Sequence, residues 1–192
     1  GLKPDVVTYT SAIGAFSRSG DVAGVFGLLG EMEKGDLAPN EWSWTSAIAA
    51  CERAGEWNQA LALFNGLRAS GGEVPGSVWT AAISAAAAGG EVEVSKSLLD
   101  EMRSAGHAPT LRSYNACLKA CERAGEWDEA LDMLNGLRAE RLEADAITYT
   151  SVLGALGRAA QWEKALGVWS SMLEAGVEPD ATALSTLMWA LV

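Results

Sequence analysis

The sequence predicts an all-α protein, a right-handed α-solenoid of stacked helix-turn-helix repeats. The segment CERAGEW occurs twice, at 51–57 and at 121–127, and the agreement continues as ALALFNGLRA (60–69) against ALDMLNGLRA (130–139). Weaker copies lie at half that spacing, at 18–22, 88–92 and 158–162, so the period is 35 residues. A fixed period of this length indicates stacked repeats and not a single globular core.

Counted from Val6, five complete units follow one another without insertion, at 6–40, 41–75, 76–110, 111–145 and 146–180. Residues 1–5 contain Leu2-Lys3-Pro4-Asp5, which resembles the end of a unit, and residues 181–192 resemble a first helix. The sequence therefore predicts a section of a longer solenoid that further repeats of the same parent chain, or a partner, would cover. Without such a cover we expect self-association through the exposed apolar side chains of Leu184, Leu187, Met188, Trp189 and Leu191.

The first helix of each unit begins near an aromatic residue and has an aliphatic residue four positions later, which is helical spacing. The aromatic residues are Tyr9, Trp44, Trp79, Tyr114 and Tyr149, and they are followed by Ile13, Ile48, Ile83, Leu118 and Leu153. This spacing favours a role in the core between helices over an exposed aromatic platform for a ligand. The helix ends at a turn where glycine suits a left-handed cap, and Ala160 is the exception to Gly20, Gly55, Gly90 and Gly125.

The second helix of each unit opens, in four of the five units, with an acidic residue, which is favourable at a helix N-terminus. An apolar stripe follows, and we assign Trp57, Trp127 and Trp162 at its start to the core. Neither helix can bury its stripe alone, so neighbouring units must stack. The third unit has the weakest pattern, with a nearly featureless 85–90 and Lys96 at an apolar position. We expect that unit to be locally less stable or more mobile.

Composition excludes several classes of function. No apolar run is a convincing membrane span, so we expect no membrane insertion. Three cysteines within helical patterns favour a reducing compartment over a disulfide framework. Cys117 and Cys121 share a helix face, but His107 is the one histidine of the chain, so we expect neither a metal nor another cofactor. No nucleophile–base pair, phosphate loop or carboxylate constellation is visible, and we expect no enzymatic activity.

The unit endings and openings identify the repeat. VVTYTSAI (6–13), AITYTSVL (146–153), RSGDV (18–22) and EAGVEPD (174–180) closely resemble the pentatricopeptide repeat of the plain 35-residue class. The tetratricopeptide repeat is the near competitor, but it has a period of 34 residues and places its aromatic residues and proline differently. The pentatricopeptide resemblance implies binding of single-stranded RNA, one base per repeat, in a mitochondrion or chloroplast, where RNA is processed or stabilised. No targeting segment is visible.

In that family the fifth and last residues of a unit read the base. The resemblance assigns this role to Thr10 with Asn40, Thr45 with Pro75, Thr80 with Thr110, Asn115 with Asp145, and Thr150 with Asp180. An aspartate accepts the ring N–H of uracil or guanine, whereas an Asn amide donates to the ring nitrogen of adenine or cytosine. Thr leaves room for a purine and Asn suits a pyrimidine, so units one, four and five are expected to prefer A, U and G, read 5′ to 3′. Pro75 and Thr110 depart from the pattern, and we assign no base to units two and three. Ordinary helix capping is the competing explanation for these side chains.

Two further rows of residues are predicted, the first from the resemblance and the second from the recurrence of arginine at one position of the unit. The second residue of a unit packs on the base, and this row consists of Val7, Trp42, Ser77, Arg112 and Ile147. A basic row near the end of the first helix is assigned to phosphate, at Arg18, Arg53, Arg123 and Arg158. Such arginines are also favourable at a helix C-terminus without any ligand.

The net charge of −11 counts against nucleic acid when taken alone, but its distribution matters more. The first fifteen residues of the five units hold six basic and three acidic side chains, while the remaining twenty of each unit together hold seven basic and twenty-one acidic. If the first helices line the inner surface, as the resemblance implies, a mildly basic groove lies inside an acidic shell and permits RNA binding of modest affinity. The alternative function is a scaffold that holds protein subunits in a large organellar assembly, which the acidic shell, Pro75 and Thr110 favour.

Overall fold

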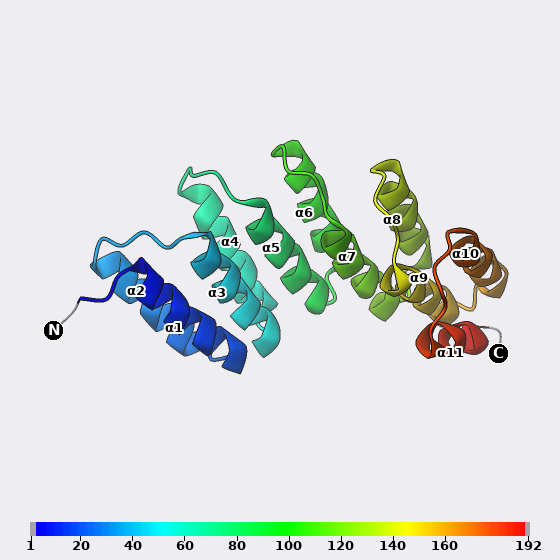
Figure 1. Ribbon diagram of the computed structural model, residues 1–192, viewed down its shortest axis with the longest axis horizontal. Helices are drawn as coiled ribbons and strands as arrows, with labels where there is room; N and C mark the ends of the chain where they lie inside the picture. The colour runs from blue at the N-terminus through cyan, green and yellow to red at the C-terminus, as the bar shows by residue number, and fades with distance from the viewer. Residues whose placement is uncertain (1–2, 191–192) are drawn as a thin grey trace.

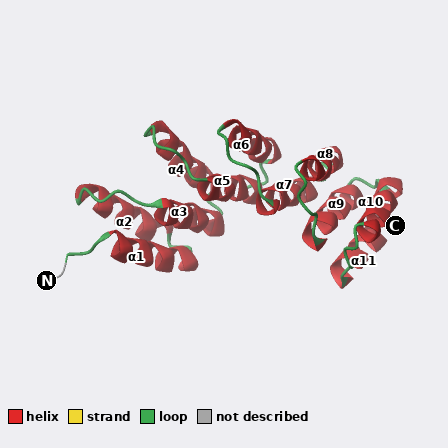
Figure 2. Cartoon of the chain, turned by 45° about the horizontal axis from the view of Figure 1, so that its top comes forward, coloured by secondary structure: helices red, strands yellow, loops and turns green. Residues whose placement is uncertain are grey.

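The computed structural model describes residues 3–190, which form eleven α-helices joined by short loops, with no strand among these residues (Figure 1, Figure 2). The helices are α1 (Val6–Ser19), α2 (Val22–Lys34), α3 (Glu41–Ala54), α4 (Trp57–Ala69), α5 (Gly76–Ala88), α6 (Val92–Ser104), α7 (Leu111–Ala124), α8 (Trp127–Ala139), α9 (Ala146–Arg158), α10 (Trp162–Glu174) and α11 (Ala181–Ala190). The odd-numbered helices begin every 35 residues.

The helices form two layers. Each odd-numbered helix contacts the odd-numbered helices before and after it, and each even-numbered helix packs against its own odd-numbered helix and the next one. The chain therefore advances in one direction from its N-terminal to its C-terminal end (Figure 1). This arrangement confirms the predicted all-α solenoid of stacked helix pairs.

The turn between the two helices of each pair uses a left-handed residue at one fixed position. Gly20, Gly55, Gly90 and Gly125 have φ angles of 71°, 75°, 82° and 74°. Ala160 adopts the same conformation, with a φ of 53°, although its Cβ makes that region unfavourable. The predicted left-handed conformation is therefore confirmed at the four glycines. Ala160 adopts it as well and carries local strain.

The core lies between the layers and runs along the whole solenoid. Trp79, Tyr114 and Tyr149 are buried there, as the helical spacing predicted, while Tyr9 and Trp44 are half-buried. Side chains of the even-numbered helices contact these rings: the Phe64 ring centroid lies 4.7 Å from that of Trp79, Arg103 contacts Tyr114, and Arg138 contacts Tyr149. The aromatic row is thus a packing element of the core, in agreement with the sequence.

The assignment of three tryptophans to the core is wrong for one of them. Trp57 and Trp127 are half-buried, because the following unit covers them: Trp57 lies against Gly89, and Lys164 lies 3.3 Å above the ring centroid of Trp127. Trp162 is 51% exposed. Among residues 3–190 no second helix follows α11 to cover it in the same way.

The first helix of the third unit is well packed, and the lower stability or greater mobility expected for this unit stays a prediction. Every residue of α5 from Val78 to Ala87 is buried, because small side chains let this helix approach its neighbours closely. Lys96, which stands at an otherwise apolar position, forms an ion pair with Glu129 of the next unit.

At the C-terminal end, Leu184, Met188 and Trp189 are exposed as expected, but Leu187 is only 7% exposed. The expectation for Leu187 is wrong because α11 packs on α9 and turns this side chain into the core. Leu2 and Leu191 lie outside the described residues. Within the described part of the chain, no helix has the length and apolar character that a membrane crossing requires.

Candidate nucleic-acid interface

The second residues of the odd-numbered helices form an exposed row. Val7, Trp42 and Ile147 are 69%, 68% and 62% exposed, and Ser77 and Arg112 are exposed as well. Because large apolar side chains are exposed at one repeated position, the row is a candidate binding surface. The row has the accessibility that stacking on a base requires.

The last residues of the units are helix N-caps. Asn40, Thr110, Asp145 and Asp180 each accept a hydrogen bond from the backbone amide three residues later, over 2.9, 3.3, 2.8 and 2.7 Å. Pro75 caps α5 without a side-chain hydrogen bond. The capping explanation is therefore true of four of the five residues. Capping does not use their full hydrogen-bonding capacity, however, since Asn40 engages its Oδ1 alone and a carboxylate has two oxygens.

In four of the five units the fifth residue is a threonine. Its hydroxyl group donates to the backbone carbonyl oxygen four residues earlier. The distances are 2.6 Å for Thr10, 2.8 Å for Thr45, 3.0 Å for Thr80 and 2.7 Å for Thr150. Because the single proton of each hydroxyl is used within the helix, these side chains are left as acceptors.

In unit four, Asn115 and Asp145 lie in one hydrogen-bond network although they are 30 residues apart. The Nδ2 of Asn115 donates to Asp145 Oδ1 over 3.2 Å. The Thr148 hydroxyl lies 2.7 Å from Asn115 Oδ1 and 2.8 Å from Asp145 Oδ1, so it links the two side chains. Burial alone would raise the pKa of Asp145, but hydrogen bonds from the backbone and hydroxyl of Thr148 and from Asn115 outweigh it and hold that pKa below its ordinary value.

In unit one, the corresponding residues are linked through Ser43. Its hydroxyl lies 2.9 Å from Thr10 Oγ1 and 3.0 Å from Asn40 Oδ1. Ser43 and Thr148 occupy the third position of their units and were not singled out from the sequence. The signal that would have found them is a hydroxyl side chain three residues after an Asn or Asp cap.

In unit five, a depression of about 240 Å³ brings together all three residues that the resemblance assigns to one base. Ile147, Thr150 and Asp180 line it, and so does Lys119 of α7. Lys119 was also missed from the sequence, and its ammonium group is paired with Glu122 at 2.7 Å.

Units two and three lack such a link. Thr45 and Pro75 share no hydrogen bond, and the third position after Pro75 is Val78, which has no hydroxyl group. Thr110 forms a reciprocal capping box with Ser113. Ser77, at the second position of unit three, donates to the carboxylate of Glu41.

The arginine row is exposed, but two of its members already have partners. Arg53 donates to the Ser17 carbonyl oxygen over 2.9 Å, and Arg123 donates to the Ala88 carbonyl oxygen over 3.1 Å. Each therefore caps the end of the preceding odd-numbered helix. The guanidinium carbon of Arg158 lies 6.0 Å from the Trp189 ring centroid, and Arg18 is exposed. A guanidinium group has five N–H donors, so the capping arginines keep donors for a further ligand.

The cysteines form no metal centre among residues 3–190. No group of three or more His, Cys, Asp or Glu side chains there is arranged to hold a metal ion. Cys51, Cys117 and Cys121 are buried free thiols. Burial raises the pKa of Cys117 to about 11 and that of Cys121 to about 12, so both behave as small apolar side chains.

The fold and these rows define a class: an α-solenoid of 35-residue helix pairs that presents an exposed side chain and a capping residue at a fixed place in each pair. The sequence model of the PPR repeat family matches residues 4–52, 109–158 and 144–192. The model of the pentatricopeptide repeat domain matches 62–123, and that of the PPR repeat matches 42–72. The chain belongs to the pentatricopeptide repeat family. No curated protein matches it significantly by sequence.

Solved structures support this assignment. The pentatricopeptide repeat protein PPR10 in complex with an 18-nt psaJ RNA element is 28% identical, with a TM-score of 0.83 over 97% of this chain and 28% of that chain. PPR10 from maize is 22% identical, with a TM-score of 0.60 over 100% and 32%. The PPR domain of Arabidopsis thaliana protein-only RNase P 1, in complex with tRNA, is 15% identical, with a TM-score of 0.79 over 92% and 94%. The last two comparisons show the shared fold alone. The chain thus spans about a quarter to a third of the length of PPR10.

Proposed function

We propose that this chain binds single-stranded RNA along the layer of odd-numbered helices, one base per unit, with A, U and G preferred at units one, four and five. The observation that carries the proposal is the hydrogen-bonded network of Asn115, Thr148 and Asp145. Capping of α9 needs only Asp145 and Thr148. Asn115 is not needed for the cap, and its hydrogen bonds hold its amide donor beside the carboxylate acceptor of Asp145, where both can face a base. PPR10, a protein of the same family, has been solved with an RNA element.

The capping geometry supports a specific hydrogen-bond assignment for units one, four and five. In unit four, the Asp145 oxygen Oδ1 is occupied by Thr148, and Oδ2 has only a 3.4 Å contact with Asn115, so it remains able to accept the N3–H of uracil. In unit one, Asn40 uses Oδ1 for the cap, so its Nδ2 is left to donate to the N1 of adenine. Asp180 would accept the N1–H of guanine beside Ile147.

Stacking supplies the second part of the proposed interaction. Each base would lie against the exposed side chain at the second position of its unit, and Trp42 offers the largest surface of that row. Base–aromatic stacking contributes about 1–3 kcal/mol per base. The remaining donors of the four arginines would meet the phosphates.

Because this proposed activity is binding, we assign no catalytic step to the chain. We further propose that it acts on RNA in a mitochondrion or chloroplast, where a bound solenoid would protect a transcript or mark it for processing. The RNA-bound member of the family supports the RNA-binding part of this proposed role.

A fluorescence titration tests the proposal. Dye-labelled RNA containing A-N-N-U-G is compared with the same RNA carrying the reversed order G-U-N-N-A, each at several salt concentrations. We expect tighter binding of A-N-N-U-G. A plot of the logarithm of the binding constant against the logarithm of salt concentration should have a slope no steeper than about −3, because about four arginines are proposed to face phosphate. Absence of binding at every salt concentration would leave the scaffold function, and equal binding of both RNAs would remove the base assignments.

A further inference from the structure

An arginine repeats near the end of the even-numbered helices and reaches the aromatic residue eleven positions later. The guanidinium carbon of Arg68 lies 5.1 Å from the ring centroid of Trp79, and that of Arg103 lies 5.7 Å from that of Tyr114. Arg138 donates to the Tyr149 hydroxyl over 3.4 Å. An arginine therefore lies over the aromatic ring at two successive junctions between units, and at the third it donates to the tyrosine hydroxyl.

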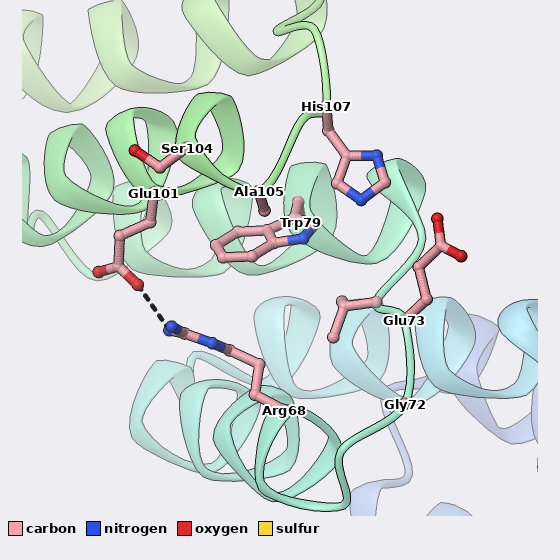
Figure 3. Close-up of a pocket in the computed structure, with 9 residues that line it drawn as sticks. Arg68, Gly72, Glu73, Trp79, Glu101, Ser104, Ala105 and His107 are labelled. Atoms are coloured by element: carbon pink, nitrogen blue, oxygen red, sulfur yellow. Dashed lines mark ion pairs between the residues drawn. The ribbon is translucent and has the colours of Figure 1, made fainter.

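A polar group of the following unit completes each arrangement. Arg68 pairs with Glu101 at 2.6 Å, as Figure 3 shows beside the ring of Trp79. Arg103 pairs with Glu140 at 2.7 Å, and Arg138 donates to the Ser171 hydroxyl. At each of these junctions an arginine is thus held between a residue of the aromatic row and a polar group of the following unit.

The junction between α2 and α4 is different. Glu33 stands eleven residues before Trp44, in the place of the arginine, and Gly66 stands in the place of Glu101. A side chain at Gly66 would meet open space, and Glu33 has no ion pair among residues 3–190. A groove of about 610 Å³ opens here, and its lining includes Glu33, Phe26, Trp44, Leu63 and Leu67. We call it the α2–α4 groove.

We propose that the α2–α4 groove binds a segment of a partner protein in which an arginine or lysine is flanked by apolar residues. The cation would lie on Trp44 and pair with Glu33, in the place that Arg68 takes between Trp79 and Glu101. The flanking apolar side chains would contact Phe26, Leu63 and Leu67. The charge of the groove favours this occupant, because its one charged lining residue, Glu33, is acidic. The ring of Trp44 also lacks a cation such as the one that Arg68 places on Trp79 at the next junction.

This site is separate from the proposed RNA interface. The α2–α4 groove is lined by residues of the even-numbered helices and, from the odd-numbered layer, by Trp44 alone. The exposed row that includes Trp42 lies on odd-numbered helices. The even-numbered layer and its loops hold most of the acidic residues of the chain, which disfavours a nucleic acid as the occupant. A basic protein segment and an RNA would therefore have room to bind at the same time.

A peptide library tests the proposal on the whole chain. Immobilised heptapeptides carry Arg, Lys, citrulline, Gln or Glu at the centre and mixtures of Leu, Phe, Met, Val and Ala at the other positions. Citrulline has nearly the shape of arginine without its charge. We expect peptides with a central Arg or Lys to bind about tenfold more tightly than their citrulline counterparts. Absence of binding, or equal binding of the arginine and citrulline peptides, would overturn the proposal.

Two variants locate the binding. Glu33→Arg supplies the missing cation within the chain, so it should occupy the ring of Trp44 and weaken the arginine peptides about tenfold or more. Glu174→Arg makes the same change in net charge on α10 and should leave their affinity within about twofold. Undiminished binding by Glu33→Arg, or equal losses in both variants, would show that the peptides bind elsewhere, through general charge attraction. If a second copy of this chain occupied the groove, the measured mass would depend on protein concentration in the absence of peptide. Loss of that dependence in Glu33→Arg, but not in Glu174→Arg, would identify self-association as the use of the groove. This result would overturn the assignment to a partner protein.

Discussion

Replacing Asp145 by Asn separates helix capping from base recognition, because Asn and Asp are nearly equal as N-caps. In the folded chain Oδ1 of Asp145 accepts from the backbone amide of Thr148 over 2.8 Å, and this cap fixes the side chain. An asparagine must keep its oxygen in that place, so its Nδ2 takes the place of Oδ2. The one group that remains for a base thereby changes from acceptor to donor.

The expected magnitudes follow from these contacts. In Asp145→Asn the free energy of unfolding should fall by about 0.5 kcal/mol, since the cap is kept and only a negative charge at the N-terminus of α9 is lost. Asp145→Ala should cost more, about 1–2 kcal/mol, because it also removes the cap and the partner of Asn115. A hydrogen bond to a charged group contributes about 1.5–3 kcal/mol, so the preference of unit four should move from U towards C by about tenfold or more.

The assay is a competition between RNAs that differ only at the fourth base of A-N-N-U-G, with urea denaturation of the same samples. Asp145→Asn should prefer C, and wild type should prefer U. A variant with native stability and unchanged preference for U would refute the recognition role of Asn115 and Asp145. A variant that loses several kcal/mol of stability would refute the account of the cap.

The remaining predictions concern stacking, backbone strain and alkaline pH. Trp42→Ala should weaken RNA binding by about tenfold with little change in stability, because this exposed ring is proposed to stack on a base, whereas Trp162→Ala, on the other layer, should leave RNA binding unchanged in the same titration. Ala160→Gly should raise the free energy of unfolding, measured by urea denaturation, by about 0.5–1 kcal/mol because it relieves a φ of 53°. Ala159→Gly, at a φ of −90°, should give no such gain. Equal effects of the two variants would contradict backbone strain at Ala160. Burial raises the pKa of Cys117 from 9.0 to about 11, so the unfolded chain releases this proton first and stability should decline as pH rises from 9 towards 11. Cys117→Ala should show a shallower decline, and an identical pH profile in both proteins would count against a buried, protonated thiol.

The fold could be predicted from the sequence because its determinants are local and recur with the period. Capping residues such as Asn40 and Asp145 mark where helices begin, and a left-handed residue such as Gly55 marks where they end. Stacking then follows, since each apolar stripe needs a neighbour. The burial of Tyr114 and Tyr149 was predictable for the same reason.

The candidate site could be predicted only in part. The rows of residues follow from the period, but their hydrogen bonds depend on which side chains the next unit brings within reach. Ser43 and Thr148 complete networks that no pattern within one unit reveals, and Arg53 uses donors on the carbonyl oxygen of Ser17. The exposure of Trp162 likewise depends on its neighbours and not on its place in the repeat.

Selection from a random RNA pool tests the alignment of units with bases most directly. The whole chain is incubated with RNA that contains a randomised stretch, and bound molecules are sequenced after each of several salt washes. We expect a five-base window with A first, U fourth and G fifth, read 5′ to 3′, and no preference at the second and third positions. A uniform base composition, or a window in which the order of A, U and G is reversed, would contradict the alignment.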